Sequence, residues 1–460
     1  MERENAWKGY QQEDLDRINE ISNDYKCLLS FNKTEREWTK EIISRLQKHG
    51  YVSLEQVIKD GITLKAGDKV YENRMGKAVL AFHIGLDPLE EGMNIVGAHI
   101  DSPRLDLKQN PLYEEADLAY GDTHYYGGIK KYQWVARELA LHGIVVKKDG
   151  TTLEIVIGEK EDDPVLGISD LLIHLSSEQM GKKLSEGVTG EDLDLILAGR
   201  PLNGEEKWPV KGMLLNILKD EYGIDEEDFV SAEIEIVPAG KARDFGLDRS
   251  MIIGYGHDDR VCAFAELKAL EAITETPKAT CCGMFVDKEE IGSVGATGMQ
   301  ANFLENTIAE ILDRMGEYSE LKVRRTLRNS RMLSCDVSAG FDPLYASVFE
   351  KKNSAFLGHG VCYNKYTGRG GKAGSNDANA EFIGKLRKIM DDHQIRWQTA
   401  ELGKVDAGGG GTIAYICALY GMEVIDSGVA VLSMHAPKEI ISKADLYEAV
   451  KAYYVFMINA

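Results

Sequence analysis

Short, nearly all-apolar segments that end in a polar or acidic residue constrain the fold of this chain more than any other feature of its sequence. Their sequences are KAVLAFHIG, MNIVGAH, SMIIGYGHD, CCGMFVDKEE, RMLSCD, MEVIDSG and VAVLSMH. Segments with helical character lie between several of them, at 259–273, 376–392, 411–420 and 443–457. Short apolar strands that alternate with helices are typical of a sheet covered on both faces. The sequence therefore predicts an α/β fold with a mixed, largely parallel sheet sandwiched by helices.

Two other regions depart from this pattern. Residues 10–49 carry apolar positions at helical spacing, which predicts two opening helices. Residues 104–245 contain strand-like segments with alternating polarity (GIVVKK, TTLEIVIG, AEIEIVP) around a polar stretch. Because the α/β pattern resumes near Ser250, we expect a mostly-β domain at 104–245, inserted into a discontinuous catalytic domain formed by 1–103 and 246–460.

Charge and cysteine content limit the expected partners and compartment. The chain has 54 Lys and Arg against 75 Asp and Glu, a formal charge of -21, which repels phosphate backbones and anionic headgroups. We therefore expect no nucleic acid and no membrane as partner. Seven scattered cysteines without a CxxC motif argue against a disulfide framework. No signal peptide or membrane span is recognisable in the sequence, and we expect a soluble cytoplasmic protein.

Candidate metal ligands recur at the ends of the predicted strands. They are His99 with Asp101, Asp258, Glu289 with Glu290, Asp336, and His435. Open α/β sheets bind ligands outside the carboxyl ends of their strands, so we expect these side chains to meet on one rim. Histidine and carboxylate groups together suit a site for two divalent metals.

Each of these elements alone has an ordinary explanation. The Glu289–Glu290 pair could be solvated surface, a single histidine such as His99 or His435 could be structural, and Asp258 could cap the helix that follows it. Histidine or carboxylate residues at the ends of five predicted strands favour a functional site, because unrelated residues of these types would rarely all fall at strand ends by chance.

The chemistry of each ligand type suggests its role. His99 and Asp336 would hold one metal, and His435 and Glu290 the other. Asp258 could bridge both ions, because a carboxylate has two oxygens.

Two carboxylates would act beside the metals. Asp101 would accept the second ring N–H of His99 and fix its tautomer. Glu289 would serve as the catalytic base that takes a proton from a water and passes it to the leaving amine.

The segments GAHIDSP, YYGGIKKYQW, LLIHLS, HDD, DKEEIGS, SCD, GSNDANAEF and SMHAPKE resemble the aspartyl aminopeptidase and vacuolar aminopeptidase I family of dinuclear zinc exopeptidases. The resemblance spans about residues 76 to 440 in the family's order and implies a zinc-exopeptidase-like fold and removal of single residues from the free amino terminus of peptides. Carried over by motif, the metal ligands are His99, Asp258, Glu290, Asp336 and His435, and the base is Glu289. The resemblance favours zinc, although cobalt or manganese would also suit these ligands.

The resemblance also implies an assembly. The counterpart of 104–245 is a dimerisation domain, and dimers build a dodecamer in which the histidine matching His174 reaches a neighbouring active site. The alternative for His174 is a core or interface histidine. Lys365 is the nearest match to a substrate-binding lysine, with an ordinary exposed lysine as its alternative. Acidic and neutral first residues both remain open, because an acidic one would need a local cation such as Lys365, Arg369 or Lys372.

Two other functions remain open from the residues alone. Two metals and a base could also serve a carboxypeptidase or an N-deacylase, because the metals do not select the end of the peptide. A non-catalytic scaffold is the second alternative, although it would not need a spare carboxylate beside the ligands.

Overall fold

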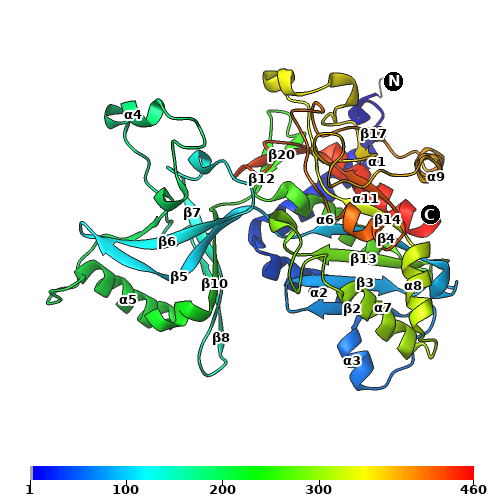
Figure 1. The fold of residues 1–460 in the computed structure, drawn as a ribbon, viewed down its shortest axis with the longest axis horizontal. Coiled ribbons are helices and arrows are strands. Elements are labelled where there is room, and N and C mark those ends of the chain that lie inside the picture. Colours follow the sequence, from blue (N-terminus) through cyan, green and yellow to red (C-terminus); the bar gives the residue numbers. More distant parts are fainter. Residues whose placement is uncertain (1–3) are drawn as a thin grey trace. The chain divides into compact units, whose positions relative to one another are not determined.

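The computed structural model describes residues 4–460 and contains two compact units (Figure 1). The larger unit consists of the chain up to Asp101, Ala242–Met434 and Glu439–Ala460. The second unit consists of Ser102–Lys241 together with the short segment His435–Lys438.

The larger unit is built on a nine-stranded sheet of order β1-β2-β3-β13-β4-β14-β18-β16-β17. Its central strands β13, β4, β14 and β18 run parallel, whereas β3 and β16 join them in antiparallel orientation. The mixed, largely parallel sheet predicted from the sequence is therefore confirmed. The strands are β1 (Val52–Ser53), β2 (Lys69–Arg74), β3 (Ala78–His83), β4 (Met93–His99), β13 (Thr280–Val286), β14 (Arg331–Cys335), β16 (Val361–Asn364), β17 (Trp397–Thr399) and β18 (Glu423–Gly428).

Helices cover both faces of this sheet, as predicted. One apolar core joins the sheet to α1 (Gln12–Phe31), α2 (Glu35–Lys48), α6 (His257–Ala272), α9 (Ala380–Asp392) and α11 (Lys443–Asn459). A second core joins it to α3 (Leu54–Lys59), α7 (Phe303–Arg314), α8 (Glu320–Asn329) and α10 (Ala414–Ala418). Strands such as β4 are buried along their whole length because both faces are covered.

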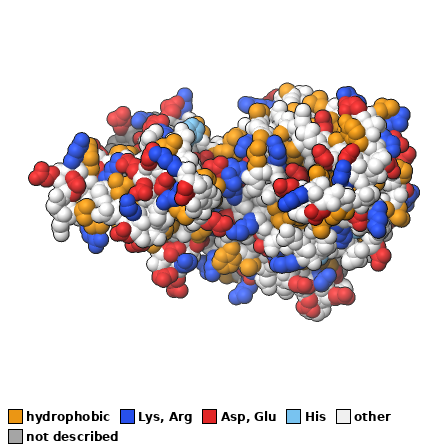
Figure 2. All heavy atoms as spheres, turned by 90° about the horizontal axis from the view of Figure 1, so that it is seen from below, with side chains coloured by type: hydrophobic (Ala, Val, Ile, Leu, Met, Phe, Trp, Pro, Cys, Tyr) orange, Lys and Arg blue, Asp and Glu red, His pale blue; other side chains and the backbone are white. Residues whose placement is uncertain are grey.

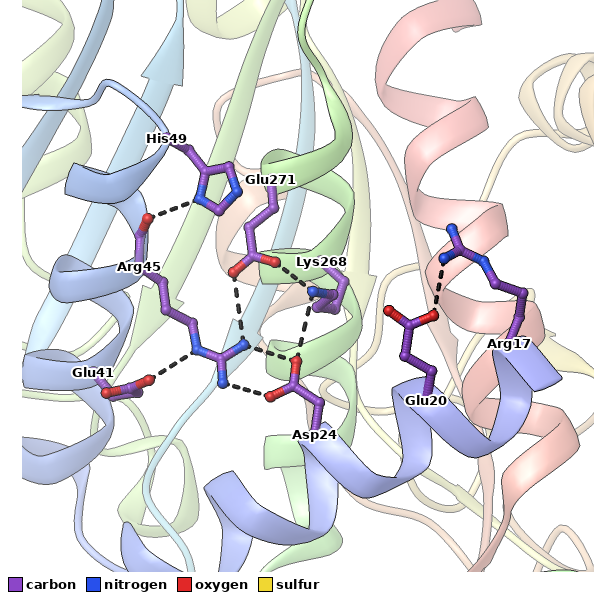
Figure 3. A network of polar contacts seen from close by, with 8 residues as sticks. All are labelled: Arg17, Glu20, Asp24, Glu41, Arg45, His49, Lys268 and Glu271. Atoms are coloured by element: carbon purple, nitrogen blue, oxygen red, sulfur yellow. Dashed lines mark hydrogen bonds and ion pairs between the residues drawn. The ribbon is translucent and has the colours of Figure 1, made fainter.

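Arg45 of α2 links the two opening helices to α6 (Figure 3). Its guanidinium contacts both carboxylate oxygens of Asp24 on α1, at 2.6 and 2.9 Å, and Glu41 at 2.8 Å. Lys268 on α6 pairs with Glu271 at 2.5 Å and with Asp24 at 3.5 Å. A bidentate arginine within a network stabilises more than an isolated surface pair.

A second, five-stranded sheet in the larger unit corrects one expectation. Its order is β11-β12-β20-β19-β15, with β11 (Arg243–Phe245), β12 (Met251–Gly254), β15 (Ser338–Ala339), β19 (Ala430–Leu432) and β20 (Glu439–Ser442). Asp258 follows β12 and His435 follows β19, so the strands before these residues are not part of the main sheet. The expectation of one sheet rim was wrong because β12 and β19 both pair antiparallel with β20, a choice of partner that apolar patterning does not encode.

The second unit contains a six-stranded antiparallel sheet of order β8-β7-β10-β5-β6-β9. Its strands are β5 (Arg104–Glu115), β6 (Leu118–Tyr126), β7 (Leu139–Val146), β8 (Thr152–Ile157), β9 (Leu195–Ala198) and β10 (Ala232–Pro238). Helix α5 (Pro209–Tyr222) contributes Val210 and Leu214 to a core that also contains the fully buried Trp134.

The surface carries charges of both signs. Figure 2 shows acidic and cationic side chains interspersed over the visible face. Among residues 4–460, no helix combines the length and apolar character needed to cross a bilayer.

Candidate metal centre

His99 is the last residue of β4 and is 1% exposed. Its Nδ1–H donates to the backbone carbonyl of Asp101 at 3.0 Å, and the Asp101 carboxylate lies 3.3 Å from the same nitrogen. The opposite nitrogen, Nε2, lies 3.2 Å from Oδ1 of Asp258. A proton on Nδ1 leaves the Nε2 lone pair available to a metal.

The pKa of His99 reflects these neighbours. Burial opposes a charge on the ring, but the contacts with Asp101 and Asp258 outweigh it and raise the pKa well above its usual value. A divalent cation held between Nε2 and the Asp258 carboxylate would replace that proton, since metal ligands bind in their deprotonated form.

Asp258 lies at an irregular first turn of α6. The N-cap of α6 is Gly256, which has a left-handed backbone. Asp258 itself has non-helical φ/ψ of -79° and 108°, and its peptide bond to Asp259 is cis. Its backbone N–H donates to the Glu439 carboxylate at 3.1 Å.

Glu289 and Glu290 begin a short 3-10 helix, Glu289–Ile291, just after β13. Their backbone N–H groups donate to Oδ1 and Oδ2 of Asp101 at 3.2 and 3.3 Å. Asp101 therefore contacts the His99 ring and also holds both glutamates. The sequence did not predict the contact of Asp101 with the two glutamates, because residues so far apart along the chain show no spacing pattern.

The structure brings five of the predicted side chains into two overlapping groups. Ligand atoms of His99, Asp258 and Glu290 all lie within 4.8 Å of one another, and so do those of His99, Glu289 and Asp336. Imidazole nitrogen and carboxylate oxygen bind zinc at about 2.0–2.2 Å, so two ligands of one ion lie at most about 4.4 Å apart. A small inward shift of the side chains would let each group hold an ion. Glu289 also lies within reach, and geometry alone does not separate a ligand from a base.

The carboxylates of this cluster repel one another. Burial, followed by the charges of Asp258 and Glu289, raises the pKa of Asp336 well above its usual value. Adjacent carboxylates can all ionise when a divalent cation lies among them. The donor types and their electrostatics therefore fit zinc.

His435 follows β19 in a strained turn, in which Ser433 and His435 have positive φ of 61° and 62°. Positive φ in residues other than glycine is uncommon and concentrates at functional sites. The ring donates from Nδ1 to the carbonyl of Gly128 at 2.8 Å. His435 belongs to the second unit and to neither group described above.

The predicted substrate residues lie outside the two groups. His174 is an exposed residue of the 3-10 helix Ile173–Leu175 in the second unit. Lys365 follows β16, is exposed and forms an ion pair with Asp377. Asp377 also pairs with Lys372 at 3.1 Å.

Comparisons with known proteins place the chain among characterised relatives. Residues 28–457 match the family described as "Aminopeptidase I zinc metalloprotease (M18)". A probable M18 family aminopeptidase 1 of Clostridium acetobutylicum is 57% identical, with 100% of this chain and 98% of the relative covered. The crystal structure of an M18-family aminopeptidase from Thermotoga maritima has a TM-score of 0.95 at 47% identity, with both chains fully covered. The S. cerevisiae mApe1 dodecamer, 21% identical, has a TM-score of 0.75 with 96% and 97% of the chains covered.

Proposed function

The chain belongs to the aminopeptidase I zinc metalloprotease (M18) family, and on this premise we propose which of its residues carry out the reaction. The predicted family, fold and metal-dependent aminopeptidase activity are confirmed by the family match and the relatives. The predicted divalent metal cofactor is confirmed as zinc. Peptides are therefore the substrates.

We assign zinc binding to His99, Asp258, Glu290, Asp336 and His435. The observation that carries this assignment is the pair of groups that share His99, each with ligand atoms within 4.8 Å of one another. Asp258 faces Nε2 of His99 and has a second oxygen with which it can bridge two ions. The role of His435 rests on the family motif, which the segment SMHAPKE carries.

Glu289 is assigned as the general base and Asp101 as the residue that orients it. When bound, the zinc ions polarise the scissile carbonyl and make the attacking water more acidic. Glu289 takes the proton of that water and transfers it to the amine of the departing peptide. Asp101 holds the backbone of Glu289 and fixes the tautomer of His99.

The test combines metal removal with a choice of substrate. Activity on a peptide with a free amino terminus should vanish on chelation and return with zinc. The same peptide with an acetylated amino terminus should be hydrolysed far more slowly. Equal rates on both peptides would contradict an aminopeptidase and favour the N-deacylase or carboxypeptidase alternative, for which the comparisons give no support.

Neutral first residues are the better substrates in our proposal. Lys365 and Lys372, two of the cations available to bind an acidic side chain, both form ion pairs with Asp377. Asp377 offsets part of their charge, and the chain as a whole carries -21. A carboxylate side chain on the substrate would therefore gain little from this loop.

The second unit is assigned to subunit association, with a dodecamer as the final assembly. Its segment around His174 exposes large apolar side chains, which are Leu171, Leu172, Ile173, Leu175, Met180 and Leu184. Large exposed apolar patches often mark interaction sites. Within such an assembly His174 would contact the substrate of a neighbouring subunit. Sedimentation of the purified protein tests this assignment, and a monomer at micromolar concentration would contradict it.

A cytoplasmic location completes the proposal. All seven cysteines are free thiols, and six of them are buried. Free thiols are usual in a reducing compartment.

A further inference from the structure

Arg260 lies in the first part of α6, two residues after Asp258, and its side chain is 0% exposed. Its guanidinium donates from Nε to the carbonyl of Ile100 at 3.0 Å and from Nη2 to the carbonyl of Lys33 at 2.7 Å. The guanidinium carbon also lies 5.4 Å from the ring centroid of Tyr255. Burying a charged group is costly unless its surroundings compensate it. The position of the Arg260 guanidinium therefore depends on the two carbonyls and the ring that it contacts.

The carbonyl that Arg260 holds is next to two residues of the metal centre. Ile100 stands between His99 and Asp101, and its backbone N–H donates to the carbonyl of Val286 on β13 at 2.8 Å. The two peptide groups of Ile100 are therefore fixed from different sides, one by β13 and the other by α6. Any movement of Ile100 would move His99 and Asp101 together.

The other contact of Arg260 is with a well-ordered connection between helices. Lys33 immediately precedes Thr34, which caps α2 through a capping box with Glu37. The backbone N–H of Lys33 donates to the Glu37 carboxylate at 2.6 Å. Arg260 thus ties the beginning of α6, which carries Asp258, to the end of β4 and to a rigid cap.

Only arginine suits this position. Its planar fork presents several N–H donors in fixed directions, whereas a lysine ammonium is a single point on a flexible stem. A lysine at position 260 could keep the positive charge but could not reach both carbonyls in this geometry.

We propose that Arg260 is a positioning residue of the zinc centre, which sets the distance between His99 and Asp258 by holding the carbonyl of Ile100. The inference rests on the ligand roles proposed above for His99 and Asp258. Arg260 itself contacts neither substrate nor metal in this account.

The test uses the full-length zinc enzyme with Arg260→Lys and Arg260→Met. Arg45→Met is the matched control, because Arg45 also links helices to α6 but contacts no residue next to a proposed ligand. Three properties are measured for each variant: the zinc dissociation constant by competition with a chelator, the visible spectrum after cobalt substitution, and the thermal midpoint.

We expect both Arg260 variants to bind zinc about 10- to 100-fold more weakly and to show an altered cobalt spectrum. Arg45→Met should lower the thermal midpoint and leave zinc affinity and spectrum unchanged. Wild-type zinc affinity and spectrum in both Arg260 variants would overturn the inference, and so would an equal loss of zinc in the control.

If neither Arg260 variant folds, Arg260→Gln provides the same test, because one short amide cannot hold the carbonyls of both Ile100 and Lys33. Weaker zinc binding and a changed spectrum are expected, and wild-type values would overturn the inference. Failure of the wild-type protein to bind zinc would instead contradict the proposed function.

Discussion

The carboxylate of Asp101 accepts a hydrogen bond from the backbone N–H of Glu289 at 3.2 Å, although the two residues are 188 positions apart. The same side chain contacts the ring of His99 and the backbone of Glu290. Asp101→Asn should weaken zinc binding about 10- to 100-fold, because an amide cannot accept hydrogen bonds from all three groups. Titration with zinc against a competing chelator measures this loss, and an unchanged dissociation constant would show that Asp101 does not orient the ligands.

Asp258 is expected to be needed by both metals. Asp258→Asn removes the charge of the bridging carboxylate, so zinc content should fall from two ions per chain to less than one. Elemental analysis of the purified variant checks this expectation. Asp248→Asn, at an exposed turn, is the control and should retain both ions. An Asp258→Asn protein that also retains two zinc ions would contradict the bridging role.

The stability of the fold should depend on the protonation of His83. This residue ends β3, is 1% exposed, and its Nδ1 has no hydrogen-bond partner among the described residues. Burial, together with the charge of Lys69, lowers its pKa to about 4, against about 6.5 in an unfolded chain. Between these values the unfolded chain binds more protons, so stability falls as the pH decreases from about 6.5 towards 4.

After allowance for solvent screening, His83 should account for about 1–2 kcal/mol of stability lost between pH 7 and pH 5. Urea unfolding at both pH values, for the wild type and for His83→Gln at one protein concentration, isolates this contribution. The variant should lose less stability than the wild type over this range. An identical loss in both proteins would contradict the neutral, buried state of His83.

Substrate preference should respond to Asp377. Asp377→Asn releases Lys365 and Lys372 from their shared carboxylate, so kcat/KM for peptides that begin with Asp or Glu should rise several-fold relative to peptides that begin with Leu. Lys388→Ala on α9 removes an exposed lysine outside this loop and serves as the control. An unchanged ratio of the two kcat/KM values would remove Lys365 and Lys372 from substrate recognition.

Strand patterning and ligand chemistry in the sequence predicted the buried central strands and the residue types of the metal centre. The apolar segment before His99 is a central buried strand. His99, Asp258, Glu289, Glu290 and Asp336 lie in two groups that share His99, although their strands belong to two sheets. Patterning did not reveal that Asp258 follows a strand of a separate sheet, since β12 is apolar whichever strand it pairs with. Asp101 and Arg260 form hydrogen bonds with backbone groups that are distant in sequence, and no spacing rule identifies such contacts.

The most direct test of the central claim is the Glu289→Gln variant, assayed for zinc content and turnover in the same preparation. The amide preserves the size of the side chain but cannot accept the proton of the attacking water. The account predicts two zinc ions per chain and a turnover lowered about 10²- to 10⁴-fold. Near-normal turnover with both zinc ions present would contradict the assignment of Glu289 as the base.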